Sequence, residues 1–108
     1  MAEDGPELPT EEGLREALDR IGVADVLLDA LSATASLGFH RVSAEGRDLG
    51  QARLAIEALR ALEPVLREGG VGETVVRDLE QARTNLQLAY AKAVAEAETE
   101  TKTEPEGP

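Results

Sequence analysis

The sequence predicts an all-α fold: a small bundle of three helices, or of four if the chain breaks near Gly22, between disordered acidic termini. The 108 residues are enough for one small domain. With one Phe and one Tyr as its only aromatic residues, the core must consist of Leu, Val, Ile and Ala, which pack well between closely spaced helices. Apolar residues recur at helical spacing through most of the chain. We assign residues 11–97 to the helical domain, and residues 1–10 and 98–108 to the termini.

The first helical segment begins at Thr10, a candidate N-cap followed by two glutamates in the first turn, where the helix dipole favours anions. Its apolar residues recur at helical spacing, namely Leu14, Ala17, Leu18, Ile21, Ala24, Leu28, Leu31 and Ala35. Gly22 lies inside this pattern and costs roughly 1 kcal/mol relative to alanine. Any break therefore falls there. Gly38 is predicted to end the segment as its C-cap.

Residues 21–37 carry a second apolar stripe, made of Val23, Leu27, Ala30 and Leu37. Only a narrow polar line remains, made of Asp25, Asp29, Ser32 and Ser36. A helix that is apolar over most of its circumference must be covered on two sides. In so small a protein, one cover is expected from a second copy. The residues predicted to mediate this association are Val23, Leu27, Ala30, Leu31 and Leu37.

The second helix follows a loop over residues 39–47. Asp48 is predicted as its N-cap, and Gln51 stands at the third helical position, which is a variant of the capping box. Pro64 cannot donate a backbone hydrogen bond, so the helix either kinks there or stops and restarts. Two successive glycines after residue 68 end it.

The third helix is predicted to start near residues 72–74 and to run to residue 97, with Val75, Leu79, Ala82, Leu86, Ala89 and Ala93 as its apolar seam. Its string DLEQAR, from Asp78, resembles DLGQAR from Asp48. The similarity does not extend further, so the two strings are not a structural repeat. Asp48 is expected to cap a helix, whereas Asp78 is expected inside one.

The net charge of −11 belongs mainly to the termini. Residues 1–12 carry five acidic residues and no basic one, and residues 96–108 carry five glutamates against one lysine. Acidic segments of this composition are typical of disordered, solubilising tails. The basic residues of the middle are scattered among acids, which argues against direct nucleic-acid binding.

The sequence argues against an enzyme and against a cofactor or metal site. There is no cysteine. His40 is the only imidazole, and the aspartate pair on the polar line supplies fewer oxygens than a hard cation requires. The glycines near residue 70 follow a helix rather than a strand, unlike those of a phosphate loop. The sequence has no signal-peptide pattern, and residues 21–39 are interrupted by aspartates. We therefore expect a cytoplasmic protein that does not bind membranes.

The order of motifs resembles a small bacterial family called domain of unknown function eighteen-forty-four. The motifs are an apolar helix ending in Leu37 and Gly38, the string DLGQARLAIEALRAL from Asp48, and RDLEQARTNLQLAY from Arg77 to Tyr90. The resemblance covers roughly residues 24–92 and implies a small helical domain without assigned activity. Tyr90 takes the family's aromatic position, whereas Gly50 departs from the larger residue common there.

Two functions of different classes follow. The first is a non-catalytic interaction or structural module that forms a homo-oligomer, expected to be a dimer, through the apolar helix of residues 21–38. The second is an accessory or regulatory protein of the bacterial translation machinery, which rests on the family resemblance alone. Peripheral membrane binding through residues 21–39 conflicts with the absence of basic residues on the polar line.

Overall fold

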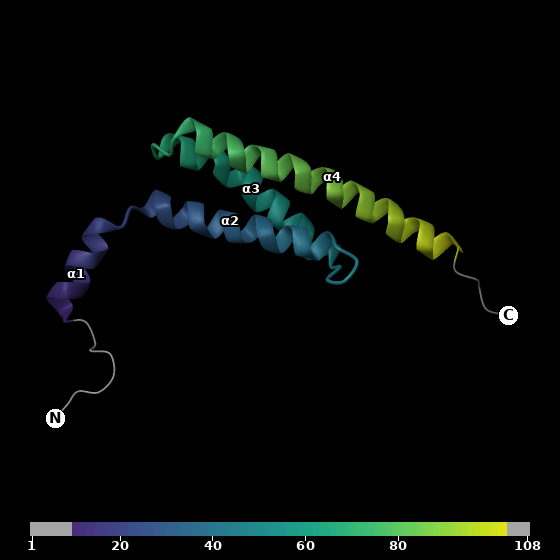
Figure 1. Cartoon of the computed structure of the whole chain (residues 1–108), viewed down its shortest axis with the longest axis horizontal. Helices are drawn as coiled ribbons and strands as arrows, with labels where there is room; N and C mark the ends of the chain where they lie inside the picture. The colour runs from purple at the N-terminus through teal and green to yellow at the C-terminus, as the bar shows by residue number, and fades with distance from the viewer. Residues whose placement is uncertain (1–9, 104–108) are drawn as a thin grey trace, which may run out of the picture.

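The computed structural model describes residues 10–103, which form four helices and no strand (Figure 1). The helices are α1 (Glu11–Arg20), α2 (Val23–Val42), α3 (Leu49–Glu68) and α4 (Glu73–Thr103). Helices α2, α3 and α4 all pack on one another, whereas α1 contacts none of them. The predicted all-α class is confirmed, with the division into four helices. Residues 1–9 and 104–108, part of the predicted disordered termini, lie outside the described residues.

The first two helices are separated at the predicted glycine. Thr10 Oγ1 accepts a hydrogen bond from the Gly13 N–H at 2.9 Å, which confirms Thr10 as the N-cap of α1. Ile21 and Gly22 then adopt extended backbone angles, and α1 meets α2 at 75°. Gly22 is the N-cap residue of α2 and makes no side-chain cap bond. The chain therefore breaks near Gly22, as the low helix propensity of glycine predicts.

Helix α2 does not end at Gly38, so the predicted C-cap is wrong. Gly38 is buried inside the helix, which continues for another turn to Val42 because Val42 also contributes to the core. A Cβ on Gly38 would lie 2.7 Å from Leu86 Cδ2 and 2.9 Å from the Ala55 Cβ. The glycine thus permits a close approach of helices instead of ending one. The connection to α3 is correspondingly shorter than predicted.

Helix α3 begins at the predicted cap. Asp48 Oδ1 accepts from the Gln51 N–H at 3.1 Å, which confirms Asp48 as the N-cap. The reciprocal bond of a capping box is replaced, because the Asp48 N–H donates to the Arg41 carbonyl at 2.8 Å. The helix continues through the exposed Pro64 and reaches Glu68, so the stop-and-restart alternative is wrong. Gly70, with φ of +88°, follows its end.

The core lies between α2, α3 and α4 and contains no aromatic side chain among its buried members. Its largest fully buried residues are Leu59, Leu66, Leu86 and Val76, and the half-buried Tyr90 packs against it. The numerous buried alanines allow short distances between the helix axes. An aliphatic core, expected from the composition, is thus present.

Ion pairs tie α3 to α4. Arg83 Nε donates to Glu63 Oε2 at 2.8 Å, and the Glu63 side chain is only 5% exposed. Near the α3–α4 turn, Arg67 bonds to both Glu73 and Glu80 at the surface. The hydrogen bonds from Arg67 hold the pKa of Glu73 below its usual value. These pairs fix how α4 lies along α3.

Helix α4 extends to Thr103, beyond the predicted end at residue 97. The prediction of a disordered tail is therefore wrong for residues 98–103. These residues have no apolar face, but a helix that is already formed adds residues at little cost, and glutamate is a good helix former. The Thr99 hydroxyl also donates to the Ala95 carbonyl at 2.9 Å.

Candidate interaction surface

Helix α2 presents two apolar faces, and one of them is uncovered. Leu31, Ala35 and Val42 lie in the core. The opposite stripe contains Val23, Val26, Ala30, Ala33 and Leu37, spaced alternately by three and four residues, which is the spacing of a coiled-coil seam. All five are exposed, Val23 at 75%, Val26 at 53% and Leu37 at 51%. No other helix of the described chain covers this stripe.

The five residues predicted to mediate association lie in different places. Val23, Ala30 and Leu37 belong to the exposed stripe. Leu27 is half-buried against the core at the edge of the stripe. Leu31 is 2% exposed and belongs to the core, so its place in the predicted interaction set is corrected. Val26 and Ala33 were not in the predicted set, although their heptad spacing with the other stripe residues is visible in the sequence.

Helix α3 carries a second exposed stripe of the same kind. It contains Gln51, Leu54, Ala58, Ala61 and Val65, again spaced alternately by three and four residues. Leu54 is 64% exposed and Val65 is 45% exposed. From the sequence alone, the apolar members of this stripe are indistinguishable from a widening of the core-facing side of the helix. Their side of α3 instead borders α2.

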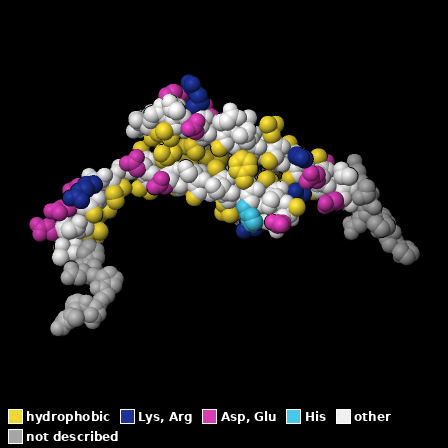
Figure 2. Space-filling view, viewed as in Figure 1, with side chains coloured by type: hydrophobic (Ala, Val, Ile, Leu, Met, Phe, Trp, Pro, Cys, Tyr) yellow, Lys and Arg dark blue, Asp and Glu magenta, His cyan; other side chains and the backbone are white. Residues whose placement is uncertain are grey.

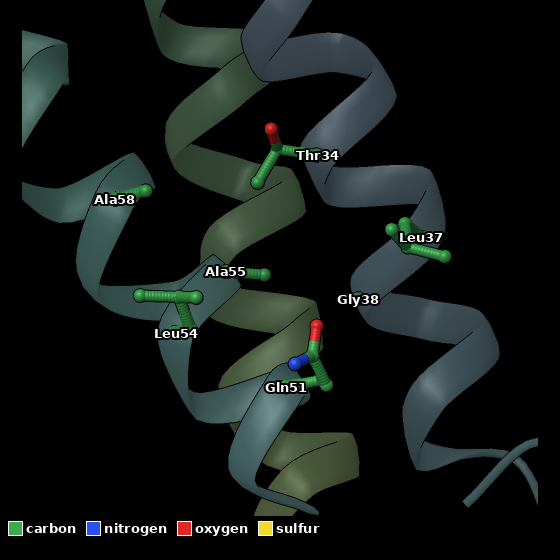
Figure 3. Close-up of a pocket in the computed structure, with 7 residues that line it drawn as sticks. All are labelled: Thr34, Leu37, Gly38, Gln51, Leu54, Ala55 and Ala58. Carbon is green, nitrogen blue, oxygen red and sulfur yellow. The ribbon is translucent and has the colours of Figure 1, made fainter. Parts of the chain in front are cut away.

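The two stripes meet in a groove between α2 and α3. The groove has a volume of about 300 Å³ and is lined by Thr34, Leu37, Gly38, Gln51, Leu54, Ala55 and Ala58. Figure 3 shows these residues on the two facing helices, with the ribbon of α4 behind them. None of the lining side chains is titratable. We call the groove and its two stripes the outer face of the α2–α3 pair, since α4 packs on the other side of these two helices.

Helix α1 adds a further uncovered apolar surface. Its residues Leu14, Leu18 and Ile21 are 48%, 59% and 51% exposed. They share one side of the helix, because they are spaced by four and three residues. Figure 2 shows apolar side chains along α1 as well as over the packed helices. An isolated helix of this length is marginally stable in water, so α1 needs a surface to pack on.

The polar residues considered as sites lie apart from the outer groove. His40 is exposed near the end of α2, where its carbonyl accepts from Ser43 Oγ at 2.6 Å. Asp25 and Asp29 are exposed on α2. Within residues 10–103, no three histidine or carboxylate side chains are grouped in a way that could hold a metal ion. Among the same residues, no single helix is long and apolar enough to cross a membrane, although the bent α1–α2 pair meets that criterion jointly.

The fold and the outer face define a small all-helical protein with an uncovered apolar surface on two adjacent helices. The chain was compared with models of protein families, with characterised proteins and with solved structures, and none of them matched. The family resemblance noted in the sequence remains a prediction.

Proposed function

We propose that the protein is a non-catalytic helical interaction module that associates with a second copy through the outer face. The observation that carries the proposal is the pair of exposed heptad stripes on α2 and α3. Large apolar side chains remain in water on both sides of an apolar groove. Complete burial of a fully exposed Val or Leu side chain is worth about 1.5–3 kcal/mol, and since most of these side chains are about half exposed, each would contribute about half of that before the cost of association. A surface of this kind is typical of an interface.

The chemistry of the groove supports binding over catalysis. Its lining offers aliphatic side chains, one hydroxyl and one amide. It therefore suits the apolar face of another helix, which such grooves recognise through residues at helical spacing. The ion pairs described above join α3 to α4 and therefore stabilise the packing of these two helices, away from the groove.

Sedimentation equilibrium at tens of micromolar tests the proposal. We expect a dimer for the wild-type protein, and a monomer with unchanged helical circular dichroism for Leu37→Asp and Leu54→Asp. Both positions are more than half exposed, so these changes leave the core intact. Leu88→Asp is the matched control, because Leu88 is 67% exposed on α4, away from the groove. A monomeric wild-type protein would overturn the proposal.

A further inference from the structure

We propose that α1 is a hinged arm that closes over the outer face of its own chain and competes there with the second copy. The closure needs only one chain. The competition rests on the proposed function, because it requires that a second copy binds the same face. Three observations lead to this inference: the break between α1 and α2, the sizes of the side chains that would meet, and the charges beside them.

The break at Ile21 and Gly22 has the properties of a hinge. The Ile21 N–H donates to the Leu18 carbonyl within α1, and the Gly22 carbonyl accepts from the Asp25 N–H within α2, so neither bond joins the two helices. Helix α1 also packs on no other helix of residues 10–103 (Figure 1). A connection of two residues is long enough for two helices to lie antiparallel. Turning α1 back along α2 therefore requires new backbone angles at one or two residues and disrupts no helix packing.

Helix α1 matches the outer face in length and in shape. Its ten residues span about 15 Å, so an arm turned back at Gly22 reaches along α2 to about Ala33. Leu14 and Leu18 would then lie over the middle of the two stripes. The side chains there are small, namely those of Ala30, Ala33 and Ala61. Large side chains of one helix pack well over small ones of its neighbours, so this part of the face suits the arm.

The charges beside the two apolar surfaces are opposite. Arg15 and Arg20 lie on either side of the apolar line of α1, because each residue turns a helix by about 100°. When α1 lies antiparallel to α2, the handedness of the helix places Arg20 on the side of Asp29 in α2 and Arg15 on the side of Glu68 in α3. None of these four side chains forms an ion pair within residues 10–103. Closure therefore brings opposite charges together.

The other charges of this region do not oppose the closure. Three acids of α1 lie on the side away from its leucines and stay in water, namely Glu12, Glu16 and Asp19. Glu11 falls at the level of Ala61, about two turns along α3 from Glu68. Arg60 and Arg67 of α3 already pair with carboxylates of α3 and α4.

Closure and association exclude each other on the outer face. The closed arm covers Val26, Ala30 and Ala33, which belong to the stripe that the second copy also uses. A connection of two residues gives the arm a high effective concentration, so it competes with a second copy present at micromolar concentration. Only the open chains dimerise, and the measured Kd therefore exceeds the Kd of the open form.

Cysteine pairs test the closure, because the natural chain contains no cysteine. Leu14 and Ala30 stand about equally far from the break, and closure brings them together. We expect Leu14→Cys with Ala30→Cys to form a disulfide within one chain about tenfold faster than Leu14→Cys with Ser32→Cys, under mild oxidation at low micromolar concentration. The second pair is the matched control, since Ser32 lies exposed on the opposite side of α2. Circular dichroism verifies that each variant is folded.

Two results of this experiment would overturn the closure. Equal rates for the two pairs would show that α1 does not lie on the outer face, and the proposed function would stand. Disulfides that form between chains rather than within one would show that the α1 of a second copy occupies the face.

Sedimentation equilibrium tests the competition. Leu14→Gln and Leu18→Gln remove apolar contacts of the arm with little change in helix propensity, and each should tighten the dimer about fivefold. Glu16→Gln, on the other side of α1, is the control and should leave the Kd unchanged. A Kd that is unchanged or raised in the leucine variants would overturn the competition. If the wild type and all variants stay monomeric, the proposed function fails and the competition with it, whereas the disulfide rates still decide the closure.

Discussion

Asp48 and Asp78 show how similar strings acquire different roles. Asp48 caps α3 through its bond to the Gln51 N–H, whereas Asp78 lies exposed within α4. In both strings the leucine and the alanine turn toward the core, as predicted. The second arginine, Arg83, pairs with Glu63, and this contact could not be read from the sequence because its partner is 20 positions away.

We therefore expect unequal effects of the same substitution at the two aspartates. Asp48→Ala should lower the free energy of unfolding by about 1 kcal/mol, because an orphan N–H at the start of α3 loses its acceptor. Asp78→Ala should change it by less than about 0.5 kcal/mol, as is usual for surface substitutions. Urea unfolding followed by circular dichroism measures both. Equal losses at the two sites would contradict the assigned roles.

Gly38 and Gly50 form a second matched pair. Gly38→Ala places a Cβ against Leu86 and Ala55 at distances that real side chains do not adopt, and overpacking of this kind costs about 1–3 kcal/mol. The gain in helix propensity, roughly 1 kcal/mol, offsets part of this cost. Gly50→Ala meets nothing closer than Asp48 Oδ1 at 3.6 Å and should gain stability from propensity. Thermal unfolding should give a lower Tm for Gly38→Ala and a higher one for Gly50→Ala, and a rise at both sites would refute the close approach.

At the scale of the elements, the α3–α4 pair depends on the buried Glu63 carboxylate. Arg83→Met should lower the free energy of unfolding by about 3 kcal/mol, because it leaves that charge without its partner. The double change Glu63→Met with Arg83→Met should restore most of the loss, since a buried pair is often replaceable by apolar residues. Arg53→Met is the control on an exposed arginine.

Urea unfolding at pH 7 distinguishes the four proteins. A double variant as unstable as Arg83→Met alone would show that the arginine acts by packing rather than by charge.

The helix starts were predicted better than the helix ends. Thr10 and Asp48 signal starts through side chains that bond to backbone groups within the next turn, so the information is local. The end of α2 depends on whether Gly38 faces open space or the side chain of Leu86, which is 48 positions further along the chain. The end of α4 depends on a helix that propagates past its packed part. Neither signal is local.

At the scale of the whole molecule, the helical class and the uncovered side of α2 followed from composition and periodicity. The contribution of α3 to the outer face did not follow, because the exposed apolar stripe of α3 has the same periodicity as its core-facing side. Only the packing of α4 shows which side of the α2–α3 pair is already covered. The separation of α1 from the other helices also required the structure, since its amphipathic pattern is that of a packed helix.

Gly38 belongs to two surfaces at once. Its backbone lines the groove on one side and touches Leu86 on the other, with no side chain between them. Any larger residue there would displace α2 and alter the shape offered to a partner at the same time as it disturbs the interior. Selection for a stable monomer and selection for a particular partner therefore act on the same position. Leu54 lines the groove but is 64% exposed, so substitutions there change the surface offered to a partner without disturbing the interior. Changes in partner preference are thus expected to arise at positions like Leu54 while position 38 stays glycine.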